Sequence, residues 1–507
     1  MMTNPRNRKQ VKCGTEIPGP GCLVIFGASG DLTKRKLIPS LFRLFRHQKL
    51  PKDFFVLGLG RTEIGMERFR ESFRYSARKA FPQDFDSPLW NEFAMRLYYS
   101  VLDYSAPDSY ASLNNRLPPL EKKHRTEGNR IFYLATPPVV YEPVVKHLGS
   151  SGLSREEGGY SRVVIEKPFG RDLDSAKRLN GMLRNSFEER QIYRIDHYVA
   201  KETVQNIFMF RFANSIFEPL WNNRYIDHIQ ITSSENLGIE HRAGYYEKTG
   251  VLRDMFQNHM LQLLALTAME PPDAFEADRV RDERVKALRS IRPILFEKLD
   301  EHVVTGQYGR GRIHGKPVVG YREESEVSES SATPTFAALK LYVDNWRWNG
   351  VPFYLRSGKR LSNWKIEISV HFKPVPHLMF FSSLEGPIDP NVLVFRVQPD
   401  EGISLNFQTK QPGSKICLKP VLMDFAYQKE VLLDAYEWVL LDCMLGDSTL
   451  FVREDGVEQA WSLLTPIIEK LESETEANAF PNYEAGSSGP REAALLIARD
   501  GRRWRPL

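Results

Sequence analysis

The stretch Cys22-Leu23-Val24-Ile25-Phe26-Gly27-Ala28-Ser29-Gly30-Asp31-Leu32-Thr33 decides the fold of the N-terminal part of the chain. It joins a short apolar run to a glycine-rich turn, and residues 37–45 continue with the apolar periodicity of a helix. Backbone N–H groups at such a strand-to-helix turn can approach a pyrophosphate, which the helix N-terminus favours electrostatically. The spacing G-x-x-G is shorter than the full dinucleotide motif, and a tight turn that merely needs glycine explains it equally well.

Four more short apolar runs follow, at residues 54–59, 97–102, 131–135 and 163–165. They are β-branched or aromatic and alternate only weakly, which is typical of strands buried on both faces. Longer helical patterns separate them. Strands that alternate with helices predict a parallel, doubly wound sheet, and we expect this domain to span residues 21–202.

The second half of the chain has a different periodicity. Ile366, Ile368, Val370 and Phe372 alternate with polar residues, and residues 339–344 and 403–408 alternate in the same way. Period-two patterns with one polar face predict a half-exposed antiparallel sheet. We therefore expect a second, α+β domain over residues 203–507, with loops at 322–331 and 472–489. We expect residues 1–20 to form a flexible leader.

The composition is that of an ordinary globular protein. Of 507 residues, 42% are hydrophobic and 26% charged, and the net charge of +5 is spread along the chain, which does not favour nucleic acid. No apolar run approaches the roughly 18 residues of a membrane helix, and the basic N-terminus lacks a signal peptide's apolar core. Without C-x-x-C spacing, the cysteines predict neither a metal site nor disulfides, so we expect a cytoplasmic protein. They are Cys13, Cys22, Cys417 and Cys443.

The second predicted strand ends at Gly58-Leu59-Gly60-Arg61. NAD-specific folds typically place an acidic residue there for the ribose 2′-hydroxyl, whereas an arginine accommodates the 2′-phosphate of NADP. Arg61 therefore favours NADP, and Glu63 two residues later makes this a preference rather than an exclusion. A solvated surface arginine is the alternative interpretation.

Two further motifs bring charged side chains to possible ligand sites. Lys167, in Glu166-Lys167-Pro168-Phe169-Gly170, follows the fifth predicted strand, where open α/β sheets bind ligands, although a plain strand-ending turn is the alternative. If residues 194–201 are helical, His197 and Lys201 share one face, and two cationic donors suit a phosphate. A charged surface face is the alternative, and spacing alone favours it.

His259 lies within an apolar stripe at helical spacing. A histidine in such a place is usually a core residue with satisfied hydrogen bonds. With a carboxylate partner it is instead suited to be a general base near neutral pH, and spacing does not decide between the two. The stripe comprises Leu252, Met255, Phe256, Met260, Leu263 and Leu264.

Together these motifs resemble the glucose-6-phosphate dehydrogenase family. The resemblance spans the chain in the expected order, except for residues 1–20. It rests on residues 27–41, 166–170, 194–206, 253–259, 351–359, 451–453 and 486–490. It implies a Rossmann-like N-terminal domain and a larger α+β domain with an extended antiparallel sheet. It also implies a homodimer or homotetramer that oxidises C1 of β-D-glucose 6-phosphate to the 6-phosphoglucono-lactone with NADP, the entry step of the pentose phosphate pathway.

The resemblance also implies site residues. His259 corresponds to the general base that removes the C1-hydroxyl proton, and Asp196 to the carboxylate that orients it. The implied substrate ligands are Lys167, Glu235, Asp254 and Lys359 for the sugar, and His197 and Lys201 for the phosphate. The implied cofactor contacts are Gly27, Ala28, Ser29, Gly30, Asp31, Leu32, Thr33, Arg61, Tyr133 and Lys167.

The chain departs from the family pattern at Trp364. The family usually has a lysine or arginine at this place, five residues after Lys359, and Lys365 comes one residue later. Either a one-residue slip brings Lys365 to the phosphate, or the phosphate is held by one cation fewer. The regular alternation that follows favours the second, because a slip would turn each side chain to the opposite face. Gly60, where the family often has alanine, is a milder change.

Two other functions stay open on the sequence. One is an NADP-linked sugar oxidoreductase similar to the glucose–fructose oxidoreductase and inositol dehydrogenase group, which also carries Glu-Lys-Pro after a strand. The predicted phosphate ligands speak against it. The other is a non-catalytic dinucleotide-sensing protein, against which the intact Asp196 and His259 speak.

Overall fold

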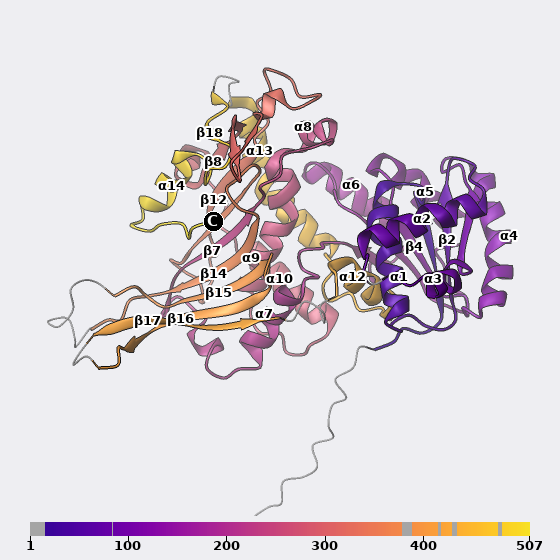
Figure 1. Cartoon of the computed structure of the whole chain (residues 1–507), viewed down its shortest axis with the longest axis horizontal. Helices are drawn as coiled ribbons and strands as arrows, with labels where there is room; N and C mark the ends of the chain where they lie inside the picture. Colours follow the sequence, from indigo (N-terminus) through magenta and orange to yellow (C-terminus); the bar gives the residue numbers. More distant parts are fainter. Residues whose placement is uncertain (1–15, 84, 378–387, 414–416, 428–432, 475–478) are drawn as a thin grey trace, which may run out of the picture. The chain divides into compact units, whose positions relative to one another are not determined.

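A computed structural model describes residues 16–83, 85–377, 388–413, 417–427, 433–474 and 479–507 (Figure 1). The described residues form two compact units: unit 1 runs to Ile165 and includes Val439–Asp447, and unit 2 comprises Glu166–Trp438 and Ser448–Leu507. The units thus divide after residue 165, whereas the sequence led us to expect a boundary after 202. Most of the predicted leader lies outside the described residues, and residues 16–20 form no helix or strand.

Unit 1 is built on a parallel sheet in the strand order β3-β2-β1-β4-β5. All of β2 and all but the first residue of β1 are buried, as expected for apolar strands covered on both faces. Each predicted strand of this sheet is confirmed. The bounds are β1 Gly21–Phe26, β2 Phe54–Gly60, β3 Leu97–Val101, β4 Arg130–Leu134 and β5 Ser161–Ile165.

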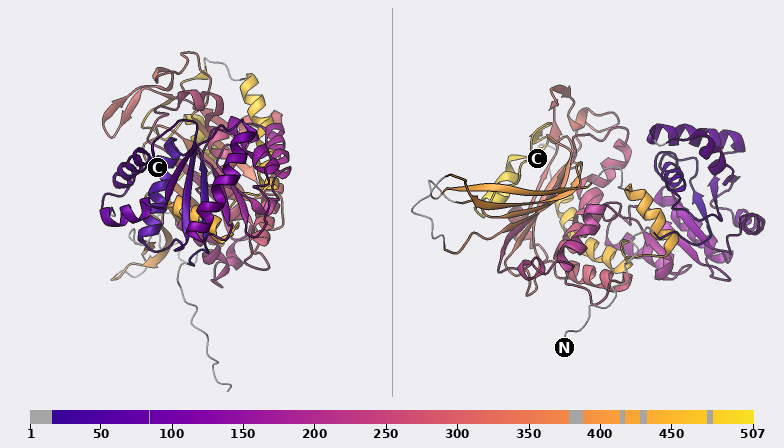
Figure 2. Two further views of the ribbon diagram at one scale, coloured as in Figure 1. Left: turned by 90° about the vertical axis from the view of Figure 1, so that its right-hand side faces the viewer. Right: turned by 60° about the horizontal axis from the view of Figure 1, so that its bottom comes forward.

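The helices of unit 1 flank this sheet (Figure 2). One of them, α1 Ile38–Arg46, packs against two others, α2 Met66–Ala80 and α3 Ser87–Ala94. A second group is α4 Pro107–His124 and α5 Tyr141–Ser150. Two short turns complete the unit, the π-helical η1 Thr33–Leu37 and η2 Pro138–Val140. The predicted doubly wound architecture is therefore confirmed.

Unit 2 contains an eight-stranded sheet in the order β17-β16-β15-β14-β7-β13-β12-β8 (Figure 1). It is antiparallel apart from the parallel pair β7·β13. The bounds are β7 Ile226–Ser234, β8 Val303–Gly306, β12 Phe336–Tyr342, β13 Pro352–Gly358, β14 Lys365–Phe372, β15 Val392–Gln398, β16 Gly402–Lys410 and β17 Leu418–Ala426.

Helices and short strands make up the rest of unit 2. The helices are α6 Leu173–Arg184, α7 Glu202–Phe212, α8 Ala243–Val251, η5 Leu252–Met260, α9 Leu261–Ala268, α10 Ala277–Arg289, α11 Leu299–His302, α13 Glu454–Glu474 and α14 Arg491–Ala498. α12 Ala435–Leu445 contributes to both units. The short strands are β6 Ile192–Arg194, β9 Tyr308–Gly309, β10 Gly311–Ile313, β11 Lys316–Val318 and β18 Tyr483–Glu484. Single turns lie at η3 Glu189–Gln191, η4 Glu218–Leu220, η6 Phe296–Lys298 and η7 Tyr321–Glu323.

The prediction of a half-exposed sheet face is wrong for β14. Its polar residues Glu367 and Ser369 are as buried as its apolar ones. The C-terminal residues cover this face: Arg505 Nε donates to Glu367 Oε1 at 3.1 Å, and Lys365 Nζ donates to the carbonyl of Pro506 at 2.8 Å. The alternation correctly predicted a strand, but it could not show that another part of the chain would cover the polar face. The predicted loop at 472–489 also begins later, because α13 continues to Glu474.

No helix in the described part of the chain has both the length and the apolar character needed to cross a membrane. Cys22, Cys417 and Cys443 are not joined in disulfides within the described residues, and Cys13 lies outside them. Within those residues, no three His, Cys, Asp or Glu side chains gather as a metal site would require.

Candidate active site

Two buried residues from distant parts of unit 2 form the centre of the candidate site. Asp196 follows β6, and His259 lies on η5. Nδ1 of His259 and Oδ1 of Asp196 are 2.5 Å apart, and both side chains are almost completely buried. Since an ionised carboxylate only accepts, this hydrogen bond makes Nδ1 the donor and leaves the lone pair of Nε2 to accept a proton.

The geometry of η5 places Asp254 and His259 on one side of the helix. The segment is π-helical, so its hydrogen bonds join residues five apart. The apolar stripe predicted a helix here, but not this wider turn. Nζ of Lys167 lies 3.1 Å from Oδ1 of Asp254 and 3.0 Å from Nε2 of His259. One ammonium group therefore contacts the carboxylate and the free imidazole nitrogen.

Burial and neighbouring charges set the protonation of these three groups. Burial lowers the pKa of His259, and the Asp196 carboxylate offsets this only in part. Burial opposes ionisation of Asp196, yet the imidazole beside it lowers the pKa of the carboxyl to about 2. Burial likewise disfavours the charged form of Lys167, but Asp254 raises its pKa overall. At neutral pH a neutral imidazole thus lies between a carboxylate and an ammonium, as a general base requires.

Two aromatic residues that sequence reasoning missed support this centre. The ring of Tyr198 stacks on His259 with centroids 4.0 Å apart and planes at 12°, and its hydroxyl lies 3.2 Å from Ser233 Oγ. The hydroxyl of Tyr245 donates to Asp254 Oδ1 at 3.4 Å. Tyr198 could have been suspected because it stands two residues after Asp196. Nothing in the sequence around Tyr245 pointed to a role.

Glu235 and Lys359 come together because β7 and β13 are parallel neighbours. Each residue directly follows its strand, and the strands end side by side with Ser234 opposite Gly358. Lys359 Nζ donates to Glu235 Oε2. Burial raises the pKa of Asp254, but the ammonium groups of Lys167 and Lys359 lower it further than burial raises it. Lys359 is therefore close enough to Asp254 to influence its charge.

The predicted helix through His197 and Lys201 is wrong. Residues 197–200 form a turn, and α7 begins only after Lys201. The reason is that the side chain of Asp196 accepts the N–H of Tyr198 at 3.0 Å, a local bond that competes with helix formation.

The turn nevertheless keeps His197 at the site, with its ring centroid 4.7 Å from that of His259. Burial lowers the pKa of His197 well below its ordinary value, and His259, Lys167 and Lys201 add to the shift. The protein alone therefore holds this ring neutral at neutral pH, whereas the sequence argument assumed a cation. The electrostatic effect of Lys201 also places its ammonium near His197.

Lys365 is engaged elsewhere. Its Nζ lies 2.9 Å from Glu367 Oε2 and 2.8 Å from the carbonyl of Pro506, which it reaches across the buried face of β14. The neighbouring Trp364 is 45% exposed. Whether Lys365 replaces the missing cation stays a prediction.

In unit 1, the glycine-rich turn fits a dinucleotide phosphate. Gly27 has φ +82°, and a Cβ there would lie 2.3 Å from the carbonyl oxygen of Ala135, so only glycine is accommodated. The hydroxyl of Thr33 donates to the Gly27 carbonyl at 3.1 Å, which closes the turn. The turn lies at the carboxyl end of β1, where doubly wound sheets bind nucleotides.

A cavity of about 340 Å³ lies beside this turn and includes Ala28 and Ser29 in its lining. Two basic residues line it, Lys34 and Arg68, and the sequence argument missed both. They supply positive charge suited to phosphate. The other lining residues are Ala28, Ser29, Thr62, Glu63, Ile64, Gly65, Phe69, Ser72 and Phe73.

The other three predicted cofactor contacts do not lie in the glycine-rich turn. Arg61 is exposed after β2, and with the hydrogen bonds from Ser105 it lowers the pKa of Asp103. Tyr133 is fully buried within β4. Lys167 belongs to unit 2. Their contacts with a cofactor stay predictions.

Two family models match the chain. "Glucose-6-phosphate dehydrogenase, NAD binding domain" covers residues 24–206, and "Glucose-6-phosphate dehydrogenase, C-terminal domain" covers residues 208–505. The chain is 46% identical over 497 residues to the glucose-6-phosphate 1-dehydrogenase of Chlamydia pneumoniae, with 96% of both chains covered. It is 45% identical over 485 residues to that of Bacillus subtilis, with 95% of this chain and 97% of the relative covered.

Solved structures agree with these matches. A glucose-6-phosphate dehydrogenase in complex with its substrate glucose-6-phosphate aligns with a TM-score of 0.88 and 34% identity, covering 97% of this chain and 100% of that one. The glucose-6-phosphate 1-dehydrogenase from Mycobacterium avium aligns with a TM-score of 0.82 and 33% identity, covering 97% and 99%. Sequence and fold therefore lead to one conclusion: the chain belongs to the glucose-6-phosphate dehydrogenase family.

Proposed function

We propose that this protein is an NADP-dependent glucose-6-phosphate 1-dehydrogenase. It oxidises C1 of β-D-glucose 6-phosphate to 6-phosphoglucono-1,5-lactone, the first step of the oxidative pentose phosphate pathway. The observation that carries the proposal is the buried Asp196–His259 pair, whose Nε2 can accept a proton. Family membership and the matched substrate complex support the choice of substrate.

His259 is the general base of the proposed reaction. Its Nε2 takes the proton of the C1 hydroxyl, while Nδ1–H remains bonded to Asp196, which stabilises the imidazolium formed. As the C1–O double bond forms, the C1–H bond breaks and its electron pair leaves with the hydrogen; NADP held by the Gly27–Thr33 turn would supply the acceptor for this hydride. Lys167, beside Nε2, provides positive charge where negative charge develops on the C1 oxygen.

The other ligands hold the substrate so that C1 meets the base. Lys167, Glu235, Asp254 and Lys359 bind sugar hydroxyls, and His197 and Lys201 bind the phosphate. A phosphate dianion favours the protonated form of His197 and so opposes the lowering of its pKa by burial. Fixing both ends of the substrate lowers the entropic part of the barrier.

The Gly27–Thr33 turn binds the cofactor diphosphate, and Tyr133 and Lys167 are further cofactor contacts. Arg61 selects NADP over NAD by contacting the 2′-phosphate. The basic Lys34 and Arg68 in the neighbouring cavity support an extra phosphate at this end of unit 1.

The protein works as a cytoplasmic homodimer or homotetramer. Its edge strand β17 supports self-association, because Leu422, Met423 and Phe425 are 63%, 61% and 53% exposed on it. Neighbouring exposed apolar side chains on an edge strand are typical of a surface that another chain covers.

His259→Asn tests the base. We expect kcat to fall by about 10²–10⁴-fold with little change in KM for glucose 6-phosphate, because the lost interaction is made chiefly in the transition state. In the parent, kcat/KM falls only as the pH drops below the ordinary histidine range, since burial lowers the pKa of His259. Steady-state kinetics across pH provide the measurement. His228→Asn, which changes a buried histidine bonded to Asp227, is the control and should keep kcat near the parent value. A near-normal kcat for His259→Asn would make His259 a core residue.

Arg61→Ala tests the cofactor preference. Removal of a guanidinium from the 2′-phosphate should raise KM for NADP at least tenfold, about 1.4 kcal/mol, and leave KM for NAD nearly unchanged. Initial rates with each cofactor decide this. Arg155→Ala removes an exposed arginine of unit 1 that pairs with Glu157 and should change neither value. Equal losses with both cofactors would contradict the role in selection.

Lys201→Ala and Lys365→Ala form a matched pair for the phosphate. Loss of a charge-assisted phosphate contact, worth roughly 1.5–3 kcal/mol, should raise KM for glucose 6-phosphate at least tenfold in Lys201→Ala. Lys365→Ala should stay within a few-fold of the parent, because its ammonium is held by Glu367 and Pro506. A similar rise in both would show that Lys365 has replaced the missing cation.

Met423→Glu combined with Phe425→Glu tests self-association through β17. Two charges on the exposed apolar strand should shift the protein from a multimer toward the 58.5-kDa chain in sedimentation velocity, because buried unpaired carboxylates are costly. Trp346→Glu changes a fully exposed aromatic residue on another loop and should leave the assembly intact. An unchanged sedimentation profile for the β17 variant would exclude this surface.

A further inference from the structure

A buried arginine behind the active site has no part in the mechanism described so far. Arg284 lies on α10 and is 2% exposed. Its Nη2 donates to Oε1 of Gln262 at 2.5 Å, and its Nη1 donates to the carbonyl oxygens of Thr449 at 3.0 Å and Phe451 at 3.4 Å. A side chain this buried and this bonded fixes the segments that it joins.

The first of these segments carries the base. Gln262 lies on α9, which continues η5 without a break, three residues beyond His259. The guanidinium therefore holds the helix of His259 through one turn of backbone.

The second segment leads to Asp196. We call residues 449–455 the strap. Val452 in the strap donates its N–H to the carbonyl of Arg194 at 3.1 Å, and the two residues form an antiparallel bridge. Arg194 ends β6 two residues before Asp196. Arg284 thus links, through the strap, the chain that carries Asp196 to the helix that carries His259.

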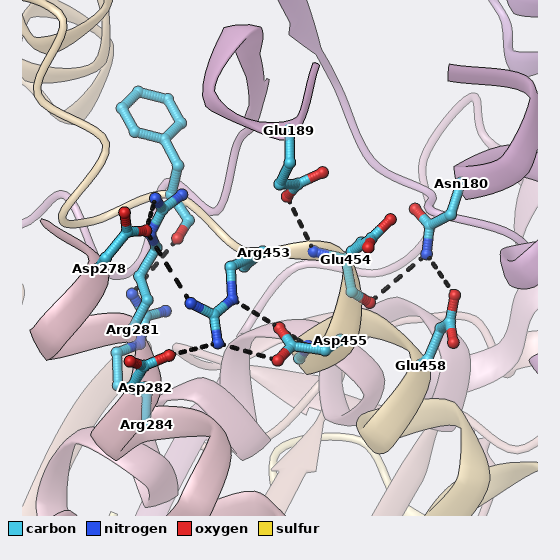
Figure 3. A network of polar contacts seen from close by, with 12 residues as sticks. Asn180, Glu189, Asp278, Arg281, Asp282, Arg284, Arg453, Glu454, Asp455 and Glu458 are labelled. Carbon is cyan, nitrogen blue, oxygen red and sulfur yellow. Dashed lines mark hydrogen bonds and ion pairs between the residues drawn. The ribbon is translucent and has the colours of Figure 1, made fainter. Parts of the chain in front are cut away.

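Further charges anchor the strap on both sides (Figure 3). Arg453 binds Asp282 of α10 at 2.6 Å and Asp455 at 2.8 Å. The N–H of Glu454 donates to Glu189 Oε1 at 3.0 Å, and that carboxylate also pairs with Arg194 at 2.6 Å. The strap is therefore fixed to α10, to η3 and to the end of β6.

Asp196 needs a compensating charge. Its Oδ1 accepts both the His259 ring N–H and the Tyr198 N–H, whereas no donor among the described residues reaches Oδ2. A buried carboxylate is costly without compensation. Burial lowers the pKa of Arg284 to about 10, and the Asp196 carboxylate opposes this shift, so the two charges lie close enough to interact.

We propose that Arg284 is a positioning residue for the Asp196–His259 pair: it holds the two segments in register and stabilises the ionised carboxylate behind the base. This inference rests on the proposed function insofar as that function makes His259 the base.

The expected pH effect follows from the charges around the pair. The groups facing His259 and Asp196 are Lys167, Asp254, His197, Tyr198 and Arg284. Without the Arg284 charge, less positive potential opposes protonation of the imidazole. The pKa of His259 then rises, so the base is protonated at a higher pH. On the acidic side of the pH profile, here called the acidic limb, the fall of kcat/KM then begins at a higher pH.

Arg284→Met, Arg284→Lys and Arg281→Met separate charge from position. For Arg284→Met we expect the acidic limb to rise by about one pH unit, with a lower kcat at its plateau. Arg284→Lys keeps the charge but loses the planar fork, so kcat falls while the limb stays in place. Arg281→Met removes a neighbouring buried arginine that pairs with Asp278, and it should leave the limb and kcat at parent values.

Two measurements are made on each full-length variant: the pH profile of kcat/KM per folded chain, and the His259 ring pKa by NMR. An unmoved limb and ring pKa in Arg284→Met, or an equal shift in Arg281→Met, would overturn the proposal. If Arg284→Met does not fold, Gln262→Ala and Arg284→Lys replace it. Each should lower kcat several-fold at unchanged KM, and parent kcat in both would overturn the positioning role.

The proposed function fails separately. If His259→Asn keeps its kcat, His259 is not the base, yet the NMR pKa still reports whether Arg284 influences the imidazole. If His259→Asn loses activity and Arg284→Met behaves as the parent, only the inference about Arg284 fails.

Discussion

The active centre depends on the hydrogen bond between Nδ1 of His259 and Asp196. Both partners are almost completely buried, and burial alone would lower the pKa of the imidazole and raise that of the carboxyl. The facing imidazole keeps the carboxylate ionised, whereas burial and the Lys167 ammonium keep the imidazole neutral although the carboxylate favours its protonation. The surrounding structure maintains this arrangement. Tyr198 stacks on the His259 ring, and Lys167 binds Asp254, which lies on the same helix as His259.

Much of the fold could be predicted from local patterns. Unbroken apolar runs identified the strands of unit 1, and alternation identified β12, β14 and β16, because side-chain periodicity follows directly from backbone geometry. Exposure was harder to predict. The polar face of β14 is covered by Arg505 and its neighbours, and a strand pattern contains no information about a segment 138 residues away.

For the site, too, local patterns predicted some features and missed those that depend on the rest of the chain. Spacing drew attention to His259 and to the turn at Gly27, but it left a core histidine and a plain turn as equal alternatives. Only the family resemblance connected His259 with Asp196 and Glu235 with Lys359, since these contacts depend on chain topology. The helix expected at His197 failed because the Asp196 side chain bonds to the N–H of Tyr198, a choice that helical periodicity cannot reveal. The neutrality of His197 likewise depends on burial, which spacing does not report.

The parallel pairing of β7 with β13 also bears on how the enzyme is assembled. The Glu235–Lys359 contact bridges 124 residues, whereas the cavity beside the glycine-rich turn is lined by residues 28–73 alone. Contacts between distant residues must first overcome the entropy of closing a long loop, so they form slowly. A chain emerging from the ribosome can form this cavity before Glu235 and Lys359 exist side by side. The pair proposed to bind the sugar is therefore completed later in synthesis than the cavity of unit 1.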